Sequence, residues 1–133
     1  MAERYFERDE VEKLIPALTR AMDAVCTAHM EAEGERERQR KEAHRITMSG
    51  GGIIDRLAWK TGTQRLQRLT TDIQHALQEI ADMGGVPKDL ELGLVDFLHV
   101  RDGRTVNLCW KYGERDIRFW HGLDEGYSAR KPL

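Results

Sequence analysis

Two tight turns in the last third of the chain constrain the fold more than any other feature. Asp102-Gly103 and Gly113-Glu114 each separate runs of alternating apolar and polar residues, which is a strong short-range signal for a β-hairpin. Because a two-residue turn fixes which residues face one another, the strand pairing follows by counting. Residues 92–121 are therefore predicted to form three antiparallel strands.

The two turns predict a single register across the three strands. Counting from the first turn places Asp96 opposite Cys109, and counting from the second places Cys109 opposite Arg118 and Asn107 opposite Trp120. Both hairpins then agree on one apolar face, which should pack on helices and gain about 1.5–3 kcal/mol per large buried side chain. That face comprises Val95, Phe97, Val106, Leu108, Trp110, Ile117 and Phe119.

The first third of the chain predicts an amphipathic helix that begins at Asp9, a suitable cap residue. Apolar residues recur there at spacings of three and four, which places them on one helix face. They are Val11, Ile15, Leu18, Met22 and Val25. Pro16 lies inside this pattern, and because it lacks a backbone donor it predicts a kink or a short break.

A second amphipathic helix is predicted from the apolar stripe between Trp59 and Ile80, and Gly84-Gly85 supplies its stop. The two helices would form an antiparallel hairpin over residues 9–83. The charged and Gly-rich span of about 34–52 is predicted to connect them, either as a solvated helix extension or as a mobile loop.

These elements predict one α+β domain over residues 1–133, a long antiparallel helical hairpin packed on a three-stranded antiparallel β-meander. A chain of 133 residues suffices for one domain with a core. The hairpin has two apolar faces, so it needs the sheet, a second copy of the chain, or both to cover them. The polar C-terminal tail 122–133 is expected to fold back over the outer face of the sheet.

That outer face carries the predicted ligand-binding site. Asp96, Cys109 and Arg118 would form a row across the three strands, bordered by Trp120, and Arg130 of the tail would add a second cation. One interpretation of this row is an ordinary solvent-exposed sheet face that carries a charge pair. The row is also what an anion or carboxylate site requires, because Arg presents several donors in a fixed fork.

Metal binding is a further hypothesis, with His121 and Glu114 as its candidate ligands. No paired histidines at helical spacing and no Cys-x-x-Cys motif accompany them, so the sequence assigns no cofactor. Cys109 beside Arg118 could also serve as a nucleophile, although no histidine is fixed within reach as its base.

Composition excludes some classes of partner. The net charge of −2 and the absence of aromatic residues in the basic span disfavour nucleic acid. No apolar run approaches the roughly 20 residues that span a bilayer. With no apolar leader after Met1, and with two cysteines far apart, we expect a cytoplasmic protein with reduced thiols.

Residue strings at both ends of the chain are shared with a known family. They are Tyr5-Phe6, Leu14-Ile15-Pro16, Leu18, Gly93-Leu94-Val95-Asp96-Phe97, Asp102-Gly103-Arg104, Leu108-Cys109-Trp110, Gly113-Glu114, Ile117, Trp120-His121, Leu123, Gly126 and Arg130. On these strings the chain resembles the small prokaryotic proteins grouped as domain-of-unknown-function family 2203. Glu7, where the family has Thr, and the span 31–52 depart from its pattern. The resemblance implies a cytoplasmic α+β protein without an assigned activity and brings no catalytic residues.

Three functions stay open at this point. The first is a homo-oligomeric interaction module, a homodimer through its helical hairpin that also binds a protein partner. The second is a small anion- or carboxylate-binding protein that uses the outer sheet face. The third is a metal-dependent hydrolytic enzyme. The sequence names neither a substrate nor a partner.

Overall fold

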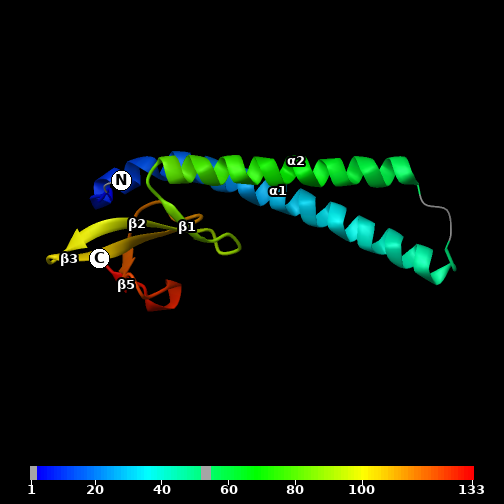
Figure 1. Ribbon diagram of the computed structural model, residues 1–133. Helices are drawn as coiled ribbons and strands as arrows, with labels where there is room; N and C mark the ends of the chain where they lie inside the picture. Colours follow the sequence, from blue (N-terminus) through cyan, green and yellow to red (C-terminus); the bar gives the residue numbers. More distant parts are fainter. Residues whose placement is uncertain (1–2, 52–54) are drawn as a thin grey trace. The chain divides into compact units, whose positions relative to one another are not determined.

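The computed structural model describes residues 3–51 and 55–133 of the chain. Within them lie two helices, five strands and one short 3-10 turn (Figure 1). The elements are α1 (Arg8–Met48), α2 (Arg56–Asp82), β1 (Val86–Asp89), β2 (Leu94–Arg101), β3 (Arg104–Lys111), β4 (Phe119–His121), η1 (Tyr127–Ala129) and β5 (Lys131–Pro132). They group into two compact units, one of Met1–Asp23 with Leu77–Leu133 and one of Ala24–Ala76. None of the described helices is long and apolar enough to cross a membrane.

The predicted α+β class is confirmed, but the sheet has five strands rather than three. Their order is β1-β2-β3-β4-β5, each antiparallel to the next, so the sheet is a five-stranded meander. The two additional strands lie at the edges and contain Pro87 and Pro132. Proline lacks the donor that an interior strand needs and is confined to such edges. These strands are short and carry no apolar alternation, so the sequence pattern did not predict them.

The charged span predicted as a connection is mostly helix. α1 is a single helix through Pro16 and on to Met48, so the predicted break is absent and the helix-extension alternative is the correct one. Its charges pair one turn apart, as in Arg36–Glu33 at 2.8 Å and Arg40–Glu37 at 2.7 Å. Each exposed pair contributes only a few tenths of a kcal/mol, about enough to support a solvated helix. Of the predicted connection, only residues 49–51 are non-helical, and Gly52 lies outside the described residues.

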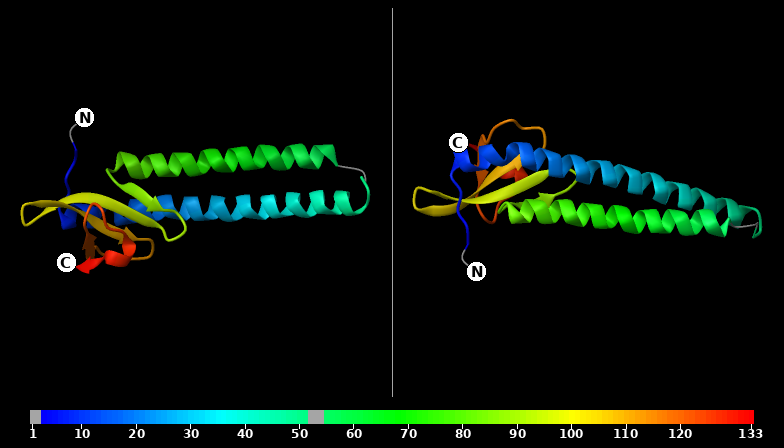
Figure 2. Two further views of the ribbon diagram at one scale, coloured as in Figure 1. Left: turned by 60° about the horizontal axis from the view of Figure 1, so that its bottom comes forward. Right: turned by 90° about the horizontal axis from the view of Figure 1, so that it is seen from above.

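In the first unit, the start of α1 lies over the inner face of the sheet (Figures 1 and 2). Six of the seven residues of the predicted inner face are buried. The seventh, Phe119, is half-buried and lies opposite Cys109, so its placement on the inner face was wrong. Phe6 precedes α1 and its ring meets the Phe97 ring edge-on at 5.1 Å between centroids. Val11, Leu18 and Met22 of α1 are fully buried in the same unit. The apolar stripe predicted for the first helix is therefore the face of α1 that packs on this sheet.

In the second unit, small side chains let the two helices approach closely. Ala28, Ala32 and Leu69 are buried together, with Leu66 and Ile73 packed against them. A Cβ at Gly62 of α2 would meet the end of the Glu35 side chain, which is only 8% exposed and would have to shift. Arg38 binds the Glu35 carboxylate through Nε at 3.0 Å, which keeps the buried charge paired.

The first hairpin has the predicted register throughout. Arg101 faces Arg104 and Asp96 faces Cys109. Asp102 and Gly103 both have positive φ, 51° and 78°, which is the conformation of the two-residue turns that match strand twist.

The second hairpin differs from the prediction. Cys109 faces Phe119, not Arg118, and Asn107 faces His121, not Trp120, so β4 is displaced by one residue. Only Gly113 has positive φ, and Glu114 N–H bonds the Lys111 carbonyl at 2.9 Å, so the turn centres on Tyr112-Gly113. A turn of this kind splays the strands that it joins.

Between that turn and β4 the chain does not pair in the sheet, and its backbone hydrogen-bonds a side chain of α1 instead. The Ile117 N–H donates to the Glu12 carboxylate at 3.1 Å, and the Trp110 indole N–H donates to the Glu114 carbonyl at 3.0 Å. Because these bonds belong to tertiary structure, counting from the turn cannot reproduce the register of β4.

Candidate metal centre

Three buried side chains with metal-binding atoms meet on the outer face of the sheet. Asp96 comes from β2, Cys109 from β3 and His121 from β4, and they are 2%, 1% and 3% exposed. A carboxylate oxygen, the thiol sulfur and a ring nitrogen all lie within 4.8 Å of one another. All three residues belong to the first unit.

The strand register brings these residues together. Asp96 lies directly opposite Cys109, while His121 lies opposite Asn107, two residues before Cys109 on the same strand. Because alternate residues of a strand point to the same face, Asn107 and Cys109 share the outer face with both partners. The displacement of β4 by one residue is therefore what turns His121 toward Asp96.

Both ring nitrogens of His121 face oxygen acceptors. Nδ1 lies 2.8 Å from the Gly122 carbonyl, and Nε2 lies 3.1 Å from each carboxylate oxygen of Asp96. A neutral imidazole has one N–H for these two acceptors, so in either tautomer one ring nitrogen presents its lone pair to an oxygen. With the N–H at Nδ1, Nε2 presents its lone pair to the carboxylate, and a cation between the two groups would relieve that repulsion. A backbone carbonyl on the distal nitrogen is a common support of metal-binding histidines.

Cys109 is a protonated thiol in this environment. Burial, and after it the neighbouring Asp96 carboxylate that accepts its hydrogen bond, raise the pKa of Cys109 to about 12, against a smaller lowering by Arg130. His121 cannot serve as its base, because both ring nitrogens are engaged elsewhere. The geometry therefore does not support the hypothesis of a cysteine nucleophile, whereas a metal ion would displace this proton and bind the thiolate.

A cavity of about 100 Å³ adjoins the three side chains. The C-terminal tail, as expected, folds back over the outer face, and Leu123, Gly126 and Tyr127 line the cavity from that side. Asn107 and Lys88 line it from the sheet. The cluster therefore opens onto an enclosed space large enough for a few non-hydrogen atoms.

Comparison with protein families gives a match over nearly the whole chain. Residues 4–133 match the model of the uncharacterised conserved protein family DUF2203. The chain belongs to this family. No curated protein and no solved structure matches the chain. The family resemblance read from the sequence is thus confirmed over nearly the whole chain, and it includes the charged span of α1.

The predicted site residues of this family member divide into two groups. Asp96 and Cys109 lie together as predicted. Arg118 does not join them, because it is exposed and binds Asp116 at 2.6 Å. Trp120 lies on the other face of β4, where its ring meets the charged ends of Arg101 and Lys131 at 5.0 and 4.8 Å.

Arg130 lies beside the cluster and its Nη2 is occupied, while its buried Nε has no hydrogen-bond partner among the described residues. It binds the Glu114 carboxylate at 2.7 Å, donates to the Cys109 carbonyl at 3.3 Å and stacks on Phe119 at 4.1 Å. Glu114 is held by this contact and by the Lys111 N–H at 2.6 Å, so it is separate from His121. Of the two predicted metal ligands, only His121 belongs to the three-residue cluster.

Asn107 and Lys88 are among the cavity residues that were not predicted as site residues. Asn107 would have been found if the register of β4 had been known, because it faces His121. Lys88 had no signal, because it belongs to a short edge strand without apolar alternation.

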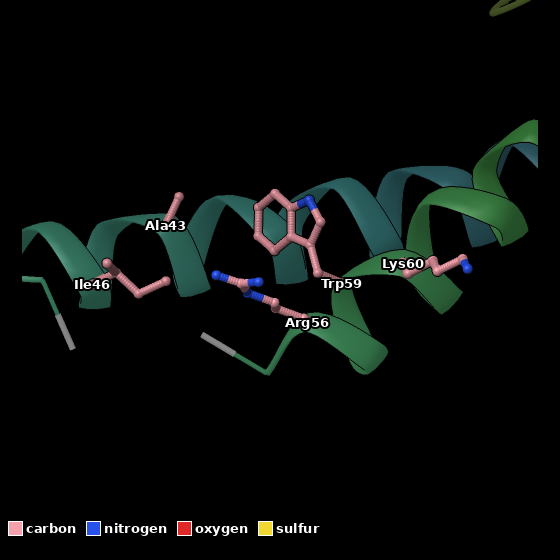
Figure 3. A pocket seen from close by; sticks show the side chains of 5 residues that line it. All are labelled: Ala43, Ile46, Arg56, Trp59 and Lys60. Carbon is pink, nitrogen blue, oxygen red and sulfur yellow. The ribbon is translucent and has the colours of Figure 1, made fainter. Parts of the chain in front are cut away.

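A second hollow, of about 440 Å³, lies within the unit Ala24–Ala76. Trp59, Arg56 and Lys60 of α2 line it together with Ala43 and Ile46 of α1 (Figure 3). Its walls are apolar apart from two cations, and no carboxylate, thiol or imidazole of the described residues lines it. This hollow therefore suits contact with another molecule, and its lining residues do not form a catalytic or metal-binding group.

Proposed function

We propose that this protein binds a divalent transition metal of the Zn²⁺ class through Asp96, Cys109 and His121. The observation that carries the proposal is the orientation of His121, whose Nε2 faces the carboxylate while the Gly122 carbonyl holds Nδ1. Without a metal these buried groups hydrogen-bond one another, and a metal ion would take the place of the Cys109 proton and bind all three.

The ligand set suits this metal class. Thiolate and imidazole favour Zn²⁺, Co²⁺ or Fe²⁺ over Mg²⁺ and Ca²⁺, which take oxygen ligands. Ligands about 2.0–2.3 Å from a tetrahedral Zn²⁺ lie roughly 3.3–3.7 Å from one another. The present spacing, 3.1 Å from nitrogen to oxygen and at most 4.8 Å within the cluster, needs side-chain movements of about 1 Å.

Three protein ligands leave one coordination position for another molecule. Sites that bind Zn²⁺ only for structure are usually closed by four protein ligands, whereas catalytic sites keep one position open. The adjoining cavity supplies the space for that position. A metal held there would polarise a bound oxygen ligand or lower the pKa of bound water to about 7. We therefore favour a metal centre that binds and activates an oxygen ligand.

Cobalt substitution tests the proposal. The wild-type protein is expected to bind one Co²⁺ and to show thiolate-to-cobalt and tetrahedral absorption bands. Asp96→Asn, Cys109→Ser and His121→Gln should each weaken binding by at least about tenfold, the usual scale for a lost contact of this strength. Cys26→Ser is the matched control, because that thiol lies outside the cluster. Bands that persist in Cys109→Ser, or vanish in Cys26→Ser, would refute the assignment.

Self-association of the helical unit is the second candidate function. Met30, Met48 and Leu57 are each 74% exposed, although the buried centre of this two-helix unit consists mainly of alanines and leucine. A contiguous exposed apolar patch marks an association surface, and we infer that these side chains contribute to one between two copies of the chain. We infer a homodimer. Light scattering should give twice the chain mass for wild type and for Val100→Glu, and the single mass for Met30→Glu with Leu57→Glu. A single mass for wild type at every concentration would exclude the homodimer.

A reducing, cytoplasmic location is consistent with both proposals. Cys26 and Cys109 are free thiols, and a metal-binding Cys109 must stay reduced. Fractionation of the native host, with the protein followed by antibody, tests the location.

A further inference from the structure

A buried amide in the cavity lacks a partner. Asn107 is 6% exposed and lines the cavity beside the metal centre. Nothing in residues 3–51 and 55–133 hydrogen-bonds its side-chain amide. Buried polar groups are almost always hydrogen-bonded. The amide atoms of Asn107 are not fully enclosed, so they remain accessible from the cavity. The Asn107 amide is therefore free to hydrogen-bond a molecule bound in the cavity.

A β-bulge places a cation at the same cavity. Pro87 pairs with Val95 and Asp89 with Leu94, so Lys88 is the extra residue of the bulge. Bulges re-aim a side chain and are frequent beside active sites. Lys88 is exposed and lines the cavity, and the described parts of the chain give it no ion-pair partner.

We propose that the cavity binds a carboxylate group, with one oxygen on the open position of the metal and the other held by Asn107 and Lys88. This inference rests on the proposed metal centre. The charges fit, since Zn²⁺ with the Asp96 carboxylate and the Cys109 thiolate sums to zero. The negative charge of the ligand is then balanced by Lys88, and the amide N–H of Asn107 supplies a directed donor.

The rest of the cavity sets the orientation and size of this ligand. Glu125 lines the tail side, and its pKa is lowered by the hydrogen bond from Lys131 and by the Gly122 N–H, so it stays ionised. A carboxylate ligand must therefore approach from the side of Lys88. A volume of about 100 Å³ holds roughly three water molecules, enough for a carboxylate and one or two carbons.

Acetate is the probe, and Zn²⁺-loaded protein labelled with ¹⁵N is the sample. Addition of acetate is expected to move the side-chain amide signal of Asn107 in a saturable way. Lys88→Met and Asn107→Leu should each weaken acetate binding by about tenfold, the effect of losing a hydrogen bond to a charged group. For Asn107→Leu the signals of Gly126 and Tyr127 report binding. Lys13→Met removes the same charge from the exposed side of α1 and should leave acetate binding unchanged.

The outcomes separate this inference from the proposed function. If Zn²⁺ binds with the expected ligands but acetate moves no cavity signal, the carboxylate site is refuted and the metal centre stands. If phosphate binds more tightly than acetate, the assignment to carboxylates is wrong. If Zn²⁺ does not bind, the proposed function fails, and the titration is repeated without metal. In that case the metal-bridged carboxylate site is overturned as well, and a response that Lys88→Met abolishes would show only that Lys88 binds acetate without metal.

Discussion

Metal binding by this protein should become tighter as the pH rises, because Cys109 must lose its proton. Burial and Asp96 raise the pKa of Cys109 from 9.0 to about 12, so the thiol is protonated throughout the neutral range. Since a pKa difference of one corresponds to about 1.4 kcal/mol, this environment offsets roughly 4 kcal/mol of metal–thiolate bonding. Below pH 12, each pH unit should raise the apparent Zn²⁺ affinity about tenfold.

The assay is competition with a chromophoric chelator at pH 7.5, 8.25 and 9.0, with the affinity of the chelator corrected at each pH. Cys109→Ser is the control. Because a serine hydroxyl does not ionise in this range, the apparent Zn²⁺ affinity of this variant should change little with pH. A weakly buffered titration should release one proton from Cys109 per Zn²⁺ bound. Equal slopes for wild type and Cys109→Ser would refute the assignment of the thiolate as a ligand.

Three further predictions concern stability, each measured by denaturant unfolding. Gly34→Ala, with open space around it, should stabilise by about 1 kcal/mol, whereas Gly62→Ala should gain less, because the Glu35 side chain must move away from the new Cβ. Leu108→Ala should cost about 2–5 kcal/mol, since Leu108 is fully buried, and a cost below about 1 kcal/mol would contradict its place in the core. Because the pKa of Cys109 is raised on folding, wild type should lose stability between pH 9 and 12 more steeply than Cys109→Ala, and parallel slopes would contradict this.

The displacement of β4 has a large consequence for the candidate site. With the predicted register, Arg118 would have faced Cys109 and the site would have been an anion site. With the observed register, His121 reaches Asp96, and the same face presents three metal-binding atoms. Side chains alternate along a strand, so a shift by one residue exchanges the two faces. The chemistry of this face therefore depends on the length of the connection before β4.

The sequence by itself determined the elements whose causes are local. The apolar stripes of the helices follow from the spacing of residues such as Val11 and Leu18. The first hairpin follows from Asp102-Gly103, whose positive φ angles match the twist of the strands. Its register places Asp96 opposite Cys109, so counting from this turn is enough to pair two of the three cluster residues.

Only the tertiary structure decided the rest of the site, because its causes are contacts between distant residues. Glu12 on α1 binds the backbone of Ile117 and helps to set where β4 begins, more than a hundred residues from Glu12 along the chain. The tail then pairs with β4 through β5 and encloses the cavity. Asp96, Cys109 and His121 form a candidate metal centre only through these contacts, and no pattern of spacing in the sequence encodes them.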